Sequence, residues 1–139
     1  MLTFKNYQLI GITQFLEKSE LKPRASRVRT RLCRLLYDKI EDLQSDEMAL
    51  LERFGQKDSE GKLLENNGTF SLCEETASEY HQEKRALLEE STSVNVDEFL
   101  DKIHVLIEDL EASEVRFSGK EAEVLDLLLE ALESEISTA

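Results

Sequence analysis

Four arginines near the N-terminus are spaced so that their side chains could bind an anion together. They follow one another at intervals of three, four and three residues: Arg24, Arg27, Arg31 and Arg34. At about 100° per residue, a helix places these positions within one arc of about 80°. Guanidinium groups in a row match phosphates or the carboxylates of an acidic protein. The spacing therefore predicts a basic stripe on one helix face that contacts an anion or a partner.

The charge of the chain offers two interpretations of this stripe. Residues 1–40 carry nine Lys and Arg and three Asp and Glu, a net charge of +6, and residues 41–139 carry −19. Pairing with acidic helices of the same chain or of a second copy needs nothing further, and it is the interpretation we favour. Contact with nucleic acid is the alternative, although only Tyr37 supplies the aromatic interleaving typical of single-strand binding.

Two pairs of carboxylates are the strongest indication of an enzyme. Glu108 with Glu111 and Glu123 with Asp126 flank a predicted loop, and all-helical nucleotide pyrophosphohydrolases hold magnesium with paired carboxylates on adjacent helices. Thirty acidic residues produce such spacings by chance, and both pairs lie off the apolar helix faces. We therefore expect solvated carboxylates and a protein that is not an enzyme, with no catalytic, cofactor-binding or metal-binding residues.

The histidines and cysteines do not form a recognisable reactive motif. His81 and His104 are the two imidazoles, and only one Asp-x-x-His pattern, ending at His104, occurs. A di-iron helical bundle would need two Glu-x-x-His motifs. Cys33 and Cys73 are far apart in the sequence, which argues against a zinc site and a disulfide scaffold. We expect both thiols to be reduced and partly buried.

The composition and the hydrophobic spacing predict a mainly α (α+β) fold. Many Leu, Glu, Lys and Arg with one Pro and five Gly favour helices over strands. We expect residues 1–139 to form a single helical domain with about five helices. The predicted starts are Asn6 as a cap, Pro23, a Ser71/Glu74 capping box, Asp97 as a cap, and a Ser118/Glu121 capping box.

The second of these helices is predicted to be unusually long, from about residue 23 to residue 54. Leu36, Leu43 and Leu50 recur every seven residues on it. Such a line forms either a seam with a second copy or part of the core of the same chain, and we favour the core.

Short extended segments make up the rest. Turn-forming residues between 56 and 72 predict a β-hairpin whose turn is Asn67-Gly68. Further extended pieces are expected at residues 2–4, 94–96 and 115–117. The last two flank one helix, so they form either a small parallel strand pair or linkers.

The apolar runs are far shorter than the roughly 20 residues of a membrane span, and the N-terminus has no secretory pattern. We therefore expect a cytoplasmic protein without a membrane partner.

Three short motifs occur in a distinctive order: Ser26–Arg31 (SRVRTR), Lys57–Lys62 (KDSEGK) and Phe117–Glu123 (FSGKEAE). In order and spacing, over nearly the full chain, the sequence resembles a family of small proteins of unknown function from phages and prophages of Gram-positive bacteria. The resemblance implies a protein made in an infected or lysogenic bacterial cell, and it transfers no catalytic residues. We expect a non-enzymatic interaction or assembly accessory protein, with a protein partner that includes a second copy of the chain as one option.

Overall fold

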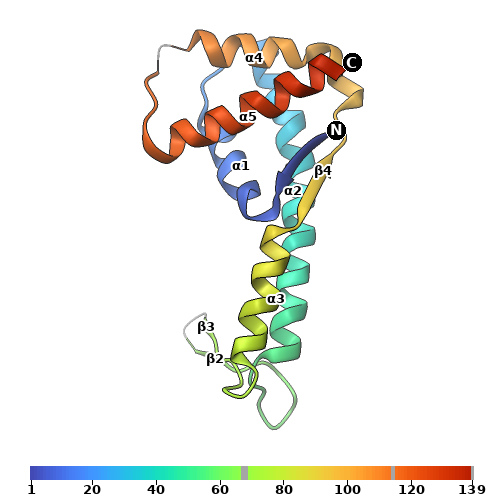
Figure 1. Cartoon of the computed structure of the whole chain (residues 1–139), viewed down its shortest axis with the longest axis vertical. Coiled ribbons are helices and arrows are strands. Elements are labelled where there is room, and N and C mark those ends of the chain that lie inside the picture. Colours follow the sequence, from blue (N-terminus) through green and yellow to red (C-terminus); the bar gives the residue numbers. More distant parts are fainter. Residues whose placement is uncertain (67–68, 114, 139) are drawn as a thin grey trace. The chain divides into compact units, whose positions relative to one another are not determined.

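The computed structural model describes residues 1–66, 69–113 and 115–138, and the chain is mainly helical there (Figure 1). With η for a 3-10 helix, the elements are β1 (Leu2–Lys5), η1 (Asn6–Gln8), α1 (Leu9–Lys18), α2 (Pro23–Phe54), β2 (Glu65–Asn66), β3 (Thr69–Phe70), α3 (Ala77–Glu89), β4 (Ser91–Val94), η2 (Asp97–Lys102), α4 (Ile103–Ala112) and α5 (Gly119–Thr138). The predicted fold class and the predicted long helix are therefore confirmed.

The contacts within the chain divide it into two compact units. Unit 1 comprises Met1–Ile40 and Ser91–Ala139, and unit 2 comprises Glu41–Glu90. Helix α2 contributes its residues through Ile40 to unit 1 and the remainder to unit 2. Each unit is described by itself.

Unit 1 has a leucine-rich core to which every helix of the unit contributes. Helix α5 packs against both α1 and α4 (Figure 1). The side chains with almost no exposed surface come from all four helices: Leu9, Ile12, Leu16, Leu32, Leu36, Ile103, Leu106, Leu128 and Leu132. Burial of each such side chain stabilises the fold by about 1.5–3 kcal/mol, so this core fixes how each helix is rotated about its axis.

The β-structure of unit 1 differs from the parallel arrangement that the sequence suggested. Strand β4 pairs antiparallel with β1, from Leu2 opposite Val94 to Lys5 opposite Ser91. Residues 115–117 form no strand, so the linker interpretation is correct for them. Leu2, Phe4 and Val94 are all buried, and burial of their shared face explains why these distant segments pair.

Three predicted helix caps are wrong because their side chains or backbones have other partners. Asn6 is buried, and its amide oxygen accepts a hydrogen bond from the Thr92 hydroxyl. The backbone of Ser71 still belongs to the hairpin region, where its carbonyl accepts from the Gln56 N–H at 2.7 Å, and α3 begins only at Ala77. The Asp97 N–H donates to the Asn95 side chain at 2.9 Å, so Asn95 forms the turn before η2.

Unit 2 contains the predicted hairpin. Strands β2 and β3 pair antiparallel with Glu65 opposite Phe70, while the predicted turn at Asn67-Gly68 lies outside the described residues. The end of α2 contacts α3 through the rings of Phe54 and Tyr80, whose centroids are 6.2 Å apart.

The leucine line of α2 is mostly buried within the chain. Leu36 and Leu43 are buried within the chain, and Leu50 is half-buried. The line therefore forms part of the chain's own interior, as we favoured from the sequence.

Gly55, where α2 ends, is required by close packing, and this can be tested. A Cβ atom at this position would lie 2.5 Å from Leu63 Cδ2 and 2.6 Å from the Leu51 carbonyl oxygen. We expect Gly55→Ala to lower the free energy of unfolding by about 1–3 kcal/mol, because the backbone oxygen cannot move away cheaply. Urea denaturation followed by circular dichroism measures the change.

Gly11→Ala is the matched control, since its Cβ would approach only Val124 Cγ2, at 4.0 Å. An alanine inside α1 should raise the free energy of unfolding by about 0.5–1 kcal/mol. Equal unfolding midpoints for the two variants would contradict the packing account of Gly55.

Candidate binding site

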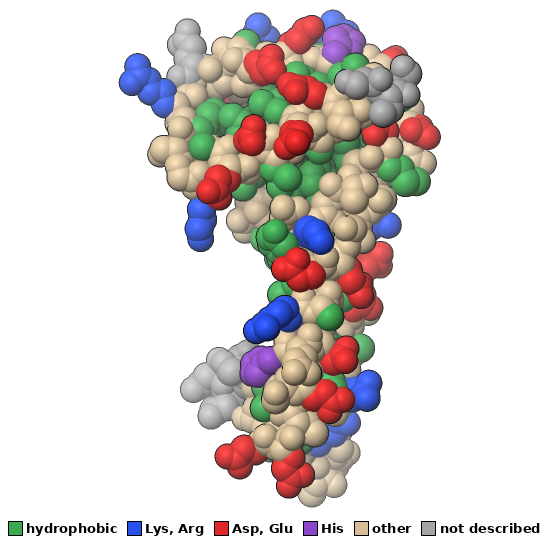
Figure 2. Space-filling view, in the orientation of Figure 1, with side chains coloured by type: hydrophobic (Ala, Val, Ile, Leu, Met, Phe, Trp, Pro, Cys, Tyr) green, Lys and Arg blue, Asp and Glu red, His purple; other side chains and the backbone are tan. Residues whose placement is uncertain are grey.

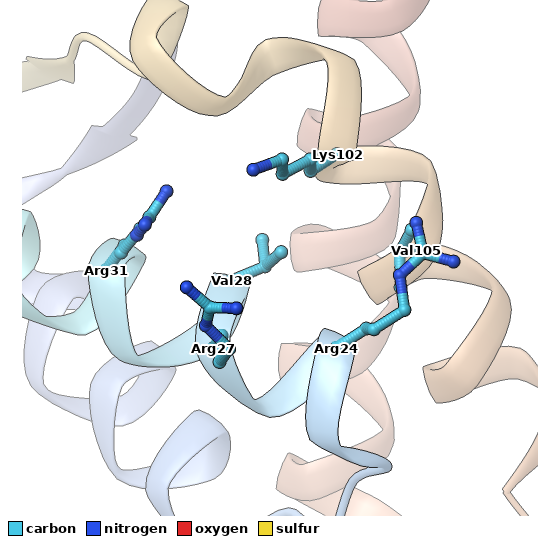
Figure 3. A pocket seen from close by; sticks show the side chains of 6 residues that line it. All are labelled: Arg24, Arg27, Val28, Arg31, Lys102 and Val105. Carbon is cyan, nitrogen blue, oxygen red and sulfur yellow. The ribbon is translucent and has the colours of Figure 1, made fainter.

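The basic stripe predicted from the sequence forms part of a pocket in unit 1. The pocket has a volume of about 80 Å³ and is lined by Arg24, Arg27, Val28, Arg31, Lys102 and Val105 (Figure 3). We call it the basic pocket. Three of the four predicted arginines line it, whereas Arg34 lies one helical turn further along α2 and does not.

The burial of one helix side determines where the arginines lie. Ala25, Val28 and Leu32 are buried in the core of unit 1. Because neighbouring helix positions differ by about 100°, burial of these residues turns Arg24 and Arg27 towards solvent and leaves Arg31 half-buried at the edge. The apolar stripe of α2 thus positions the cationic side of the pocket.

The opposite side of the basic pocket comes from η2 and α4. In Figure 3 the Lys102 ammonium group and the Arg31 guanidinium group extend towards each other across the pocket, and Val28 lies between them. The Arg24 guanidinium group lies beside Val105. Lys102 was not predicted, because no local pattern indicates which part of α2 this segment packs against.

The start of α2 is held next to α4 by a side-chain hydrogen bond. The Lys22 N–H donates to Asp109 Oδ2 at 2.7 Å, which satisfies a backbone donor at the helix N-terminus. A carboxylate in this position also interacts favourably with the helix dipole. The two sides of the basic pocket are therefore connected directly as well as through the core.

Within the described part of the chain, no carboxylate pairs with the cations of the basic pocket. Across residues 1–66, 69–113 and 115–138, Arg24, Arg27, Arg31 and Lys102 form no ion pair within 4 Å. The favoured interpretation is pairing with acidic helices of the same chain or of a second copy, and pairing within the same chain finds no support in these residues. Like charges held near one another repel, so an incoming anion would relieve that repulsion.

Arg29 lies on the other side of α2 and has a structural role. Its guanidinium group donates to the carbonyl oxygens of Leu16 and Ser19 and, at 2.7 Å, to the Ser26 hydroxyl. These acceptors lie at the end of α1 and the start of α2. Arg29 therefore fixes the turn that brings α2 to the core, while the stripe arginines do not.

A larger hollow in unit 1 has a different character. It measures about 600 Å³, and its walls include Phe15 and Phe117, whose rings are 5.5 Å apart. Figure 2 shows hydrophobic side chains gathered in the region of α4 and α5. At its rim Lys18 pairs with Glu121 at 3.2 Å, so part of its charge is already neutralised. The basic pocket is the stronger candidate for binding an anion.

The other predicted reactive groups are not brought together. Glu108, Glu111, Glu123 and Asp126 are all exposed, and His81 and His104 are exposed too. In the described portion of the chain, no three His, Cys, Asp or Glu side chains form a group that could hold a metal ion. Nor does any helix there combine the length and apolar composition that crossing a membrane requires.

The fold and the site together define a mainly helical protein with a cationic pocket on the flank of a long helix. A family model described as "Protein of unknown function (DUF1617)" matches residues 1–138, and the chain belongs to that family. This confirms the predicted membership of a family of unknown function. Neither the search of curated proteins nor the search of solved structures gave a match.

The contrast between Arg29 and Arg27 gives a stability prediction. We expect Arg29→Gln to lower the free energy of unfolding by about 1–3 kcal/mol, because it removes donors from partly buried carbonyl oxygens. Arg27→Gln should change that free energy by less than about 0.5 kcal/mol, since Arg27 is exposed and forms no ion pair with any residue that the structure describes. Urea denaturation of both variants measures the difference, and equal losses would contradict the assigned roles.

The two free cysteines should differ in reactivity. Burial, with a smaller contribution from Glu17, raises the pKa of the Cys33 thiol to about 11, although Arg29 acts in the opposite direction. At pH 8 only about one Cys33 thiol in a thousand is then ionised. We expect the Cys73→Ser variant, which retains Cys33, to react with a soluble disulfide reagent only slowly until it is unfolded.

The Cys33→Ser variant is the comparison, because Cys73 is only half-buried. Its remaining thiol, Cys73, should react with the reagent faster than the Cys33 thiol of the folded Cys73→Ser variant does. Rapid reaction of Cys33 in the folded protein would show that this side of α2 is accessible.

Proposed function

We propose that this chain is a non-enzymatic interaction protein that binds an acidic segment of a protein partner in the basic pocket. The observation that carries the proposal is the group of four cations around one small pocket, none of them paired within the described residues. Carboxylates entering between Arg27, Arg31 and Lys102 would form charge-assisted hydrogen bonds, which are stronger than those between neutral groups.

Carboxylates lie close to the basic pocket on two sides, and they favour a short acidic segment over a long polyanion as the ligand. Exposed Asp38 lies one helical turn beyond Arg34, and Glu108 and Asp109 line the neighbouring hollow beside Arg24. A nucleic acid extending beyond the pocket would meet these carboxylates and a chain whose net charge is −13. A protein segment with two or three carboxylates would meet only the cations. Nucleic acid remains the alternative ligand for the stripe.

The cellular setting is part of the same proposal. The resemblance of the three motifs to small phage and prophage proteins supports a partner made in an infected or lysogenic bacterial cell. We propose that the interaction takes place in the bacterial cytoplasm.

Binding of a defined acidic peptide tests the proposal. A fluorescently labelled peptide of alternating Glu and Gly, titrated with the protein, should show saturable binding by anisotropy at about 50 mM salt. Binding should weaken at about 500 mM salt, because salt screens the electrostatic attraction between the peptide and the pocket. Arg27→Gln together with Arg31→Gln should weaken binding roughly tenfold or more. A charge-assisted hydrogen bond contributes up to about 1.5–3 kcal/mol, so the loss of even one of them is enough for a roughly tenfold weakening.

The variant with Arg116→Gln and Lys120→Gln is the control, because it changes the net charge equally at two exposed positions of unit 1 that do not line the basic pocket. It should bind the peptide as the wild type does. Equal weakening by both double variants would refute a specific site. Single-stranded and double-stranded oligonucleotides form a parallel arm: binding of these, but not of the peptide, with the same dependence on Arg27 and Arg31 would establish the nucleic-acid alternative instead.

A further inference from the structure

The same chain carries an exposed stripe with the chemistry that the basic pocket would recognise. Residues 41–90 include fourteen Asp and Glu but only five Lys and Arg, a net charge of −9. Figure 2 shows many acidic side chains on the surface of α2 and α3 in this unit. Four exposed positions on α2 recur at intervals of four, three and four residues: Glu41, Ser45, Met48 and Glu52.

This spacing places the four side chains on one narrow face of α2, within an arc of about 60°. We call this face the acidic stripe. Glu41 and Glu52 stand at its ends, and neither forms an ion pair within the part of the chain that the structure describes. The stripe is thus an unpaired anionic surface on a regular helix.

Met48 is an apolar side chain between these two carboxylates. It is 44% exposed, although a methionine is normally favoured in contact with other apolar groups. Ser45, three residues before Met48 on the stripe, is small and polar, so Met48 is the only apolar side chain among the four. The acidic stripe therefore offers one apolar group flanked by two negative charges.

The basic pocket has the complementary arrangement. Val28 and Val105 supply apolar surface, and Arg24, Arg27, Arg31 and Lys102 supply positive charge around it. The lengths also agree. The arginine stripe from Arg24 to Arg34, of which Arg34 lies beyond the pocket, extends about 15 Å along the helix, and the acidic stripe from Glu41 to Glu52 extends about 16 Å.

We infer that the acidic stripe of one copy of this chain docks on the basic pocket of a second copy, with Met48 against Val28 and Val105 and the flanking glutamates against the arginines. This inference rests on the proposed function and names the partner of that site. The charges determine which surfaces meet, and the methionine contributes the apolar contact that is insensitive to salt.

Light scattering coupled to size-exclusion chromatography of the full chain tests the inference. At about 50 mM salt, the wild type should have a mass at least twice that of one chain, and at about 500 mM salt the mass should fall towards one chain. Arg27→Glu with Arg31→Glu should give one chain at low salt, and so should Glu41→Lys with Glu52→Lys, because like charges then meet at the exchanged positions. In the first variant glutamates at positions 27 and 31 face Glu41 and Glu52, and the pocket as a whole loses its net positive charge. In the second, lysines at positions 41 and 52 face the arginines.

An equimolar mixture of these two double variants should regain the higher mass, since opposite charges face each other again in mixed pairs. Glu79→Lys with Glu83→Lys is the control for Glu41→Lys with Glu52→Lys, because it makes the same change of net charge at exposed positions of α3 outside the stripe. It should assemble as the wild type does. Met48→Ala should raise the dissociation constant roughly tenfold through the lost apolar burial.

The outcomes separate this inference from the proposed function. A wild type that has the mass of one chain at low salt, yet binds the acidic peptide in an Arg27- and Arg31-dependent way, would overturn self-docking and leave the peptide-binding function intact. Assembly that persists in both charge-reversed double variants would likewise overturn it, because the two named surfaces would then not form the contact. A wild type that neither binds the acidic peptide nor assembles at low salt would refute both the proposed function and self-docking.

Discussion

The burial of the apolar side of α2 in unit 1 is the constraint on which the rest of the structure depends. Ala25, Val28, Leu32 and Leu36 face the core and are almost fully buried. Rotating the helix to bury any other face would bring arginines into an apolar interior, where an unpaired charge is very costly. One rotation therefore satisfies the core, and it determines that Arg29 faces the turn after α1 while the stripe arginines remain at the surface.

That constraint also explains how a cluster of like charges is maintained. The pocket cations are attached to α2 and to η2, and both elements are fixed by buried side chains, such as Leu32 of α2 and Phe99 of η2. The Asp109 carboxylate holds the start of α2 beside α4 through the Lys22 N–H. Because the backbone elements are fixed, ligand binding needs to order only the exposed side chains and not the helices that carry them, which limits the conformational entropy lost on binding.

The features that the sequence predicted correctly are local ones. The extent of α2 follows from Pro23, Gly55 and an apolar period between them, and the phase of the arginines follows from helix geometry alone. The incorrect predictions depend on distant residues. Asn6 was expected to cap a helix, yet its side chain bonds to Thr92, and β4 pairs with β1 across most of the chain. Lys102 completes the basic pocket only because the core brings η2 to α2, and periodicity within one helix carries no such information.

The arrangement of charges along α2 supports the proposal that the basic pocket binds an anionic ligand. Arg27 has Arg24 three residues before it and Arg31 four residues after it, so its nearest neighbours on the helix carry the same charge. Like-charged neighbours at these spacings cost a few tenths of a kcal/mol each, about as much as an opposite charge would contribute. Acidic residues are common in this chain, which has thirty of them. A glutamate in place of Val28 or Leu35 would interrupt the apolar side of α2, whereas a glutamate in place of Arg24 or Arg31 would not. The repulsion between the neighbouring arginines could thus be removed by a single glutamate at position 24 or 31, yet the chain carries arginines there. An anionic ligand that binds between the arginines would offset this repulsion, which gives their arrangement a physical reason.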